Sequence, residues 1–179
     1  MNYIKTSIEG PIIIEPKVFG DNRGYFFESF SLRDFEENVC PISFVQDNES
    51  FSAKKGVIRG LHFQKGDDAQ AKLLRVVQGA VLDVAVDIRP GSATFGKYVS
   101  VELTAGNKRM FFIPRGFAHG FLVLEDNTKF QYKCDNYYAP QSEGSYRWDD
   151  PAFGIDWGVN PDDVILSAKD AAAPYFIAK

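Results

Sequence analysis

The sequence predicts an all-β protein, an antiparallel sandwich or barrel with a few short helices at its periphery. Short apolar or alternating runs follow one another along most of the 179 residues and are separated by glycine, proline, asparagine and aspartate, a pattern typical of strands joined by tight turns. Aromatic residues make up 15% of the chain, with 16 Phe and 8 Tyr, and they favour strands. No repeat, low-complexity tract or linker divides the sequence, so we expect one domain over residues 1–179.

The expected strands follow the order of the apolar runs. They cover Pro11–Glu15, Gly24–Phe30, Phe44–Ser50, Val57–Gln64, Ala71–Gln78, Ala80–Ile88, Lys97–Thr104, Arg109–Ile113, Phe117–Leu124 and Thr128–Cys134. A helix is expected over Leu32–Asn38, because Ser31 is a suitable N-cap and Asp34 follows three residues later. From about residue 146 the chain is irregular, with short helices expected near 161–164 and 168–173.

Two segments alternate clearly enough to predict which side chains share a face. In the segment from Ala80, one face carries Leu82, Val84, Val86 and Ile88, and the other carries Val81, Asp83, Ala85 and Asp87. In Thr128–Cys134, the row of Phe130, Tyr132 and Cys134 points Tyr132 inward. An inward tyrosine needs a partner for its hydroxyl, either a hydrogen bond in the core or a substrate.

Composition argues against several classes of protein. The formal charge is −4 and the pI is near 5.2, whereas proteins that bind nucleic acid or anionic membranes are normally basic. No apolar stretch approaches the roughly 20 residues of a membrane-spanning helix, and the N-terminal segment lacks the apolar region of a signal peptide. With only Cys40 and Cys134, a disulfide framework is not expected and a cytoplasmic location fits. Only two histidines, His62 and His119, are present, so one chain cannot build a three-histidine metal site.

His62 lies in the apolar segment Val57–Gln64, where a histidine is usually a hydrogen-bonded core residue. The nearby cations Arg59 and Lys72 favour a functional site, because a buried strand rarely recruits positive charge unless it meets an anion or a developing negative charge. Strict alternation places Arg59 and His62 on opposite faces. A bulge at Gly60 would bring both side chains to the same side.

Other candidates have an ordinary structural interpretation beside a functional one. His119 is either a hydrogen-bonded turn residue or a ligand contact. Together with His62 and either Asp83 or Glu125 it would complete a minimal facial triad, but neither histidine has a second ligand at a metal-binding spacing, so no metal is expected. Asp170 alone is typical of a surface or capping carboxylate.

Three further features also have both a structural and a functional interpretation. Tyr137 and Tyr138 are either rim packing or a stacking platform for a base. Arg23 and the polar trio of residues 46–48 are consistent with simple turn chemistry. No glycine-rich phosphate loop and no Gly-x-Ser-x-Gly elbow is present.

Taken together, an ordered set of segments resembles the dTDP-4-dehydrorhamnose 3,5-epimerase family, a branch of the cupin, or jelly-roll, superfamily. The segments are Asp21–Glu28, Phe44–Asn48, Gly56–Phe63, Lys72–Val76, Val81–Arg89, Phe112–Phe121 and Tyr137–Pro140. They follow the family order at close to the family spacing, and the resemblance extends from about residue 10 to residue 157. It implies a cupin jelly roll that uses no metal or cofactor, and a homodimer whose pocket is shared between subunits.

The resemblance also implies a reaction, the inversion of the two carbons that flank the keto group of dTDP-4-keto-6-deoxy-D-glucose, which yields dTDP-4-keto-L-rhamnose on the route to dTDP-L-rhamnose. Removing such a proton needs a positioned base and a group that stabilises the enolate charge. By resemblance His62 is the base and Asp170 orients it. Lys72 lies near the keto oxygen, and Tyr132 returns a proton from the opposite face. We expect Asp83, from its strand position, to hold Lys72 or His62.

Substrate contacts are implied in the same way. The resemblance assigns Arg23, Arg59 and Lys169 to the diphosphate, Glu28, Gln46 and Asn48 to the nucleotide or sugar, Tyr138 to the thymine, and His119 and Glu143 to further contacts. Arg23 and Glu28 are expected to reach the site of the neighbouring subunit.

Two departures from the family pattern leave the activity class unchanged. Glu49 stands where many members have histidine, and the loop of residues 65–70 is unusually acidic. Three alternatives stay open. One is an epimerase that inverts a single carbon of a related dTDP-4-ketodeoxysugar. The others are a non-catalytic cupin that binds a nucleotide sugar and a metal-dependent cupin oxygenase.

Overall fold

The computed structural model describes residues 1–176, so the last three residues of the expected 1–179 domain lie outside the described residues. Its strands are β1 (Asn2–Lys5), β2 (Ile12–Glu15), β3 (Val18–Asp21), β4 (Gly24–Phe27), β5 (Gln46–Ser52), β6 (Ile58–Gln64), β7 (Lys72–Gln78), β8 (Ala80–Asp87), β9 (Tyr98–Thr104), β10 (Met110–Ile113), β11 (Phe117–Val123), β12 (Thr128–Cys134) and β13 (Glu143–Ser145). Its helices are α1 (Leu32–Asn38) and α2 (Ala168–Ala171), with 3-10 turns η1 (Gly66–Asp68), η2 (Pro140–Ser142) and η3 (Pro161–Asp163).

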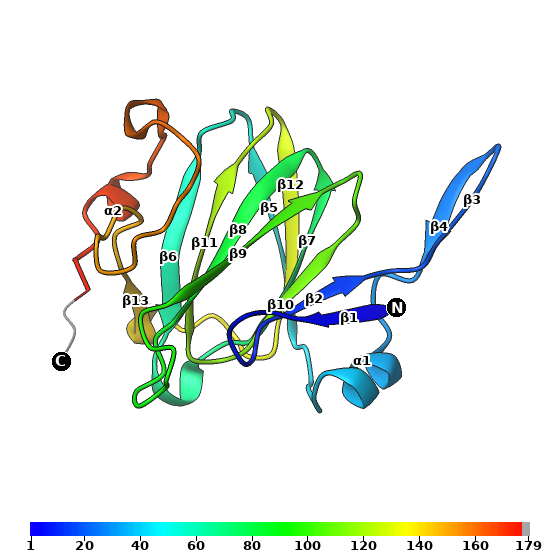
Figure 1. Cartoon of the computed structure of the whole chain (residues 1–179), viewed down its shortest axis with the longest axis horizontal. Coiled ribbons are helices and arrows are strands. Elements are labelled where there is room, and N and C mark those ends of the chain that lie inside the picture. The colour runs from blue at the N-terminus through cyan, green and yellow to red at the C-terminus, as the bar shows by residue number, and fades with distance from the viewer. Residues whose placement is uncertain (177–179) are drawn as a thin grey trace.

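Two antiparallel sheets face each other, as Figure 1 shows, and a two-stranded hairpin projects from one side. The larger sheet has the strand order β1-β2-β10-β7-β12-β5, and the second sheet has the order β13-β6-β11-β8-β9. Neighbours such as β7 and β12 are far apart in the sequence, as in the double Greek key of a jelly roll. The all-β prediction is therefore confirmed. No helix within the described part of the chain is long and apolar enough to cross a membrane.

The expected elements agree with the structure except where strands are very short. Helix α1 has the expected bounds, and the hydroxyl of Ser31 accepts the backbone N–H of Asp34 at 3.4 Å. Strands β1, β3 and β13 were not expected, because none of their residues is buried and no apolar face marks these segments as strands. The strand expected to run from Gly24 to Phe30 ends at Phe27. The strand expected from Phe44 begins two residues later, because Phe44 packs edge-on against Phe35 of α1, with ring centroids 5.7 Å apart.

Apolar rows on both faces of the second sheet build two cores. Val81 and Ala85 of β8 pack between the sheets, as their alternation predicts, whereas Val84 and Val86 point to the outer face. The segment after β13 covers that outer face with side chains that include Trp148. Fully burying a large apolar side chain contributes about 1.5–3 kcal/mol to the free energy of folding. The irregular segment after β13 therefore stabilises the fold. This position also brings α2 against β6.

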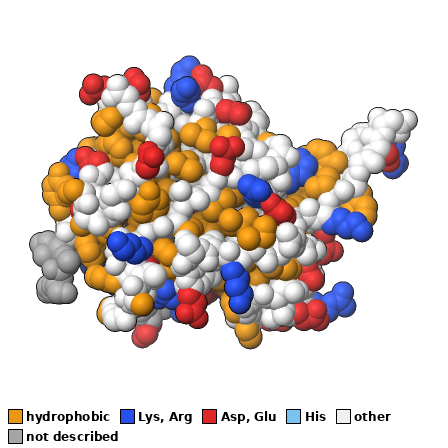
Figure 2. Space-filling view, viewed as in Figure 1, with side chains coloured by type: hydrophobic (Ala, Val, Ile, Leu, Met, Phe, Trp, Pro, Cys, Tyr) orange, Lys and Arg blue, Asp and Glu red, His pale blue; other side chains and the backbone are white. Residues whose placement is uncertain are grey.

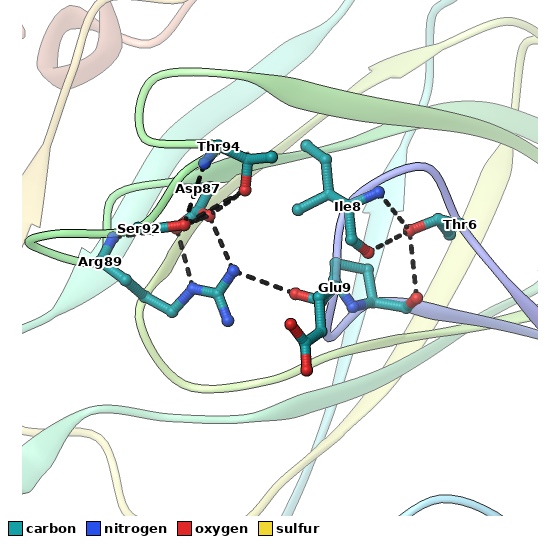
Figure 3. Close-up of polar contacts among 8 residues, drawn as sticks. Thr6, Ile8, Glu9, Asp87, Arg89, Ser92 and Thr94 are labelled. Atoms are coloured by element: carbon teal, nitrogen blue, oxygen red, sulfur yellow. Dashed lines mark hydrogen bonds and ion pairs between the residues drawn. The ribbon is translucent and has the colours of Figure 1, made fainter.

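A buried carboxylate ties the loop after β8 to the loop between β1 and β2 (Figure 3). Asp87 accepts hydrogen bonds from Arg89 at 2.7 Å and from the hydroxyls of Ser92 and Thr94 at 2.6 Å each. Arg89 also donates to the backbone carbonyl of Glu9 at 3.0 Å. Burial by itself would raise the pKa of Asp87, but these hydrogen bonds together hold it well below its ordinary value. The network fastens one end of the sandwich.

Candidate active site

A bulge in β6 brings Arg59 and His62 to the same side of the sheet. On the neighbouring strand β11, His119 lies opposite His62 and Phe121 lies opposite Arg59, so two steps along β11 correspond to three along β6. Gly60 lies in the shift with a φ of +123°, and a Cβ there would lie 2.7 Å from a backbone oxygen of β11. Only glycine fits such a close approach. The expected bulge is therefore confirmed, and both side chains line one cavity.

His62 is paired with a carboxylate from the far end of the chain. Its Nε2 lies 2.6 Å from Oδ1 of Asp170, whose side chain is 5% exposed. Ser167, the N-cap of α2, donates its hydroxyl to the other carboxylate oxygen at 2.7 Å. Burial alone would raise the pKa of Asp170, but the hydrogen bonds from His62 and Ser167 lower it overall. The ionised carboxylate thus orients the ring and would stabilise an imidazolium.

Lys72 and Tyr132 face His62 from the opposite sheet. Lys72 begins β7 on the row that continues with the core residue Leu74, and Tyr132 of β12 lies opposite Leu74 in register. The Nζ of Lys72 is 5.9 Å from the centroid of the Tyr132 ring. Burial lowers the pKa of Lys72 and raises that of Tyr132. The enclosed phenol is therefore protonated at neutral pH and able to donate.

A second histidine–aspartate pair lies deeper between the sheets. Asp83 lies 3.0 Å from Nε2 of His119, and both side chains are buried. Asp83 was expected to hold Lys72 or His62, and in the structure its hydrogen-bond partner is His119. His119 itself lies within β11 and not in a turn. Burial lowers the pKa of His119, although the charge of Asp83 opposes this shift. The charge of Asp83 also opposes the effect of burial on Lys72.

The cavity has two parts that share His62, Lys72 and Tyr132. One part, of about 410 Å³, is also lined by Arg59 and Lys169. The other, of about 280 Å³, is lined by residues that include Gln46, Asn48, Tyr138 and Glu143. Two parts that meet at three residues suit a ligand with two portions, whose reactive centre lies at the shared residues.

Side chains at the mouth of the cavity are linked to one another. Lys169 Nζ lies 2.6 Å from Glu143, and the hydroxyl of Tyr138 donates to the same carboxylate at 3.3 Å. The hydrogen bond from Lys169 is the main reason why the pKa of Glu143 lies below its ordinary value. Gln46 and Asn48 are joined by a 3.0 Å hydrogen bond between their amides. These groups form a polar rim around the shared centre.

Two of the expected contacts lie away from this cavity. Arg23 is at the turn of the β3–β4 hairpin, its side chain is 86% exposed, and it pairs with Asp21 at 2.6 Å. Glu28 is exposed just after β4. The hairpin points away from the body of the molecule, and in the space-filling view of Figure 2 charged side chains of both signs lie near its tip. Neither residue reaches the cavity of its own chain.

Two residues that support the site, Ser167 and Gln64, were not expected from the sequence. Ser167 anchors Asp170, and its Ser-x-x-Asp spacing is the local signal that could have found it. Gln64 is nearly buried, accepts the backbone N–H of Ala139 at 2.8 Å and donates to the carbonyl of Tyr137 at 3.1 Å. It positions the Tyr138 segment across a long sequence separation, for which no local signal exists.

Within residues 1–176, no group of three or more His, Cys, Asp or Glu side chains lies close enough together to hold a metal ion. The absence of a metal requirement stays a prediction for elemental analysis.

The family model described as dTDP-4-dehydrorhamnose 3,5-epimerase matches residues 5–177. The chain belongs to this family. A relative of that name from Salmonella typhimurium is 56% identical over 97% of this chain and 94% of its own length. The crystal structure of an epimerase from Legionella pneumophila in complex with dTDP-4-keto-L-rhamnose is 50% identical, covers 99% of both chains and has a TM-score of 0.92. A 3'-monoepimerase from Streptomyces bikiniensis in complex with dTDP-quinovose is 35% identical over 96% of this chain, with a TM-score of 0.87.

Proposed function

We propose that this member of the dTDP-4-dehydrorhamnose 3,5-epimerase family inverts both carbons beside the keto group of dTDP-4-keto-6-deoxy-D-glucose and forms dTDP-4-keto-L-rhamnose. The observation that carries the proposal is a carboxylate-oriented histidine that faces an enclosed lysine and tyrosine across one cavity. Relatives that are 50–56% identical over nearly the whole chain bear the name of this activity. The chain is accordingly an isomerase.

Proton abstraction falls to His62. Because its Nε2 is hydrogen-bonded to Asp170, the proton of the neutral ring stays on Nε2 and the lone pair of Nδ1 is left to accept the proton from carbon. The electron pair of the broken C–H bond moves onto the keto oxygen. The ammonium of Lys72 stabilises this enolate, an effect typically worth about 3 kcal/mol of barrier.

Reprotonation falls to Tyr132 on the other sheet. Its hydroxyl gives a proton to the same carbon from the face opposite His62, and the enolate electrons form the new C–H bond with inverted configuration. The raised pKa of Tyr132 keeps the acid form available. Solvent then returns a proton to the phenolate and removes one from the imidazolium. The second carbon follows by the same two transfers.

A proton-exchange experiment tests the reaction directly. The purified chain is incubated with dTDP-4-keto-6-deoxy-D-glucose in heavy water, and the sugar is followed by NMR. The proposal expects deuterium at both carbons that flank the keto group and the signals of dTDP-4-keto-L-rhamnose. No exchange would refute the enzymatic proposal and favour a non-catalytic binding cupin.

The same spectrum separates the single-centre alternative. A monoepimerase would place deuterium at only one of the two carbons. The monoepimerase neighbour is 35% identical, against 50–56% for relatives named as 3,5-epimerases, which favours inversion of both centres.

We also propose that the chain acts as a homodimer in which the β3–β4 hairpin, here called the arm, completes the site of the partner. The arm leaves Phe19, Tyr25 and Phe26 between 53% and 70% exposed, and aromatic side chains exposed together are typical of an interface. It presents Arg23 and Glu28 away from the cavity of their own chain. Light scattering should give a mass of twice 20.1 kDa, and a monomeric mass would refute this arrangement. Phe26→Asp should shift the protein to monomers and lower dTDP affinity, with Lys5→Asp as the control on an exposed residue of β1.

Compartment, metal content and domain number complete the proposal. Cys40 and Cys134 are free thiols, which supports a reducing, cytoplasmic location. Elemental analysis should find no stoichiometric iron, manganese or zinc, and finding one would favour the oxygenase alternative. Residues 1–179 should unfold in a single cooperative transition if they form one domain.

A further inference from the structure

The inward row of β5 carries a buried hydroxyl that no residue from 1 to 176 satisfies. The Oγ of Ser50 is buried and has no hydrogen-bond partner among the residues that the structure describes. Ser50 lies opposite Phe130 in register, and Phe130 is buried between the sheets, so the serine side chain also points inward. Buried hydroxyls are nearly always hydrogen-bonded, so this one calls for a partner from outside the chain.

The position of Ser50 indicates where that partner would lie. Ser50 lines the larger part of the cavity, together with His62, Lys72 and Tyr132. Along the same row, Asn48 is opposite Tyr132 and already engages Gln46 and the Cys134 sulfur. Ser50 is thus the diagonal neighbour of the tyrosine across the strand pair, within reach of a ligand that the tyrosine contacts.

The guanidinium of Arg59 closes the other side of this position. Its Nη2 donates to the backbone carbonyl of Phe51 at 3.3 Å, directly beside Ser50. Ser50 therefore lies between a cation expected to contact diphosphate and the phenol expected to protonate carbon. Tyr138 and Glu143 line the other part of the cavity, and Ser50 does not. The base of the nucleotide is therefore a poor candidate for its partner.

We infer that Ser50 is a sugar-positioning residue, whose hydroxyl bonds a hydroxyl group of the hexose ring and holds the ring between His62 and Tyr132. This inference rests on the proposed function, because it takes the ligand to be a nucleotide-linked hexose. A single hydroxyl contact of this kind fixes the rotation of the ring about its link to the diphosphate, which decides which carbon faces the base.

Binding measurements on Ser50→Ala separate the sugar from the diphosphate. Calorimetry with dTDP, which carries the diphosphate but no sugar, should give a Kd within twofold of wild type. With dTDP-L-rhamnose the Kd should rise by about 5- to 10-fold, the size of one neutral hydrogen bond. An equal rise for both ligands would make the contact a phosphate contact, and no rise for either would remove Ser50 from binding. Both results overturn the inference.

A matched control comes from the same row of the same strand. Ser52 is buried two residues along from Ser50 and does not line this cavity. Ser52→Ala should leave both Kd values within twofold of wild type. If it weakens dTDP-L-rhamnose as much as Ser50→Ala does, the effect comes from the strand and the inference fails.

Analogues of dTDP-L-rhamnose that each lack one ring hydroxyl identify the bonded group. Wild type should bind one of these analogues about 5- to 10-fold more weakly than it binds dTDP-L-rhamnose. The Ser50→Ala variant should bind that same analogue as tightly as it binds dTDP-L-rhamnose. If every deletion weakens both proteins equally, Ser50 touches no ring hydroxyl and the inference is overturned. Deuterium exchange by wild type reports on the proposed function separately. If wild type shows no deuterium exchange, the proposed epimerase function is refuted. If wild type is active but every hydroxyl deletion weakens wild type and Ser50→Ala equally, only the role of Ser50 is refuted.

Discussion

Replacing Asp170 by asparagine tests whether the His62–Asp170 pair supplies the base. The carboxylate is 5% exposed and lies 2.6 Å from Nε2 of His62, so the imidazolium formed during proton abstraction loses a charge-assisted hydrogen bond in the variant. Such a bond contributes about 1.5–3 kcal/mol, which corresponds to roughly a 10- to 150-fold change in rate. The new amide can also donate to Nε2 and thereby place the ring proton on Nδ1. In serine-protease triads this change of tautomer costs about 10⁴-fold in kcat.

We therefore expect Asp170→Asn to lower kcat by about 10²- to 10⁴-fold. The assay is deuterium uptake beside the keto group, followed by NMR, with dTDP affinity measured in parallel to show an intact pocket. Ser167→Ala is the matched variant. It removes one hydrogen bond to the carboxylate, at 2.7 Å, and keeps the charge, so it should lose only about 2- to 10-fold. A kcat for Asp170→Asn within threefold of wild type, with dTDP binding retained, would refute the assignment of the base.

Four further predictions concern the base, the acid, the buried network and the bulge. His62→Ala should abolish deuterium uptake while dTDP still binds. Tyr132→Phe should retain deuterium exchange and lower the rate of inversion by about 10²-fold. If Tyr132→Phe slows exchange and inversion equally, proton transfer from the opposite face is contradicted. Asp87→Asn should lower the free energy of unfolding by about 3 kcal/mol and the melting temperature by roughly 10 °C at neutral pH. Because the pKa of Asp87 is depressed in the folded state, its contribution to stability is present above the ordinary carboxyl pKa and is lost as pH falls toward the folded-state pKa. If the melting temperatures of wild type and Asp87→Asn differ by the same amount from neutral pH into acid, the network is not ionised. Gly60→Ala should destabilise by about 3 kcal/mol or more, because its Cβ would lie 2.6 Å from the backbone of β11. Gly24→Ala shares a positive φ but meets nothing within 4 Å, so it should lose only about 1–2 kcal/mol; equal losses in chemical denaturation would contradict tight packing at the bulge.

Much of the fold follows from local patterns. Alternation in β8 placed Val81, Asp83 and Ala85 on one face, and the structure packs the two apolar members between the sheets. Alternation in β12 likewise turned Tyr132 inward. The bounds of α1 followed from the capping serine at its start. These features are predictable because a side chain in a regular strand or a capped helix takes its direction from its immediate neighbours.

The expectations that failed depend on partners distant in the sequence. Asp83 was placed on the correct face, but its hydrogen bond to His119 spans 36 residues and depends on β8 lying beside β11. Strand β3 exists only because it pairs with β4. Its Val18 and Phe19 are exposed, so no buried face marks the segment as a strand. Short range patterns carry no information about which strand becomes a neighbour.

By itself the sequence determined the class of fold, the family and the inward direction of Tyr132, because alternation, capping and ordered motifs are properties of neighbouring residues. The resemblance implied the pairing of Asp170 with His62, and the bulge at Gly60 was a hypothesis. The tertiary structure decided that Asp170 meets His62 across 108 residues and that the bulge turns Arg59 into the same cavity. It also decided that Arg23 stands on an arm away from its own site. These outcomes depend on strand order and on the packing of one sheet against the other. The contacts that stabilise them join segments far apart in the sequence, which no local pattern relates.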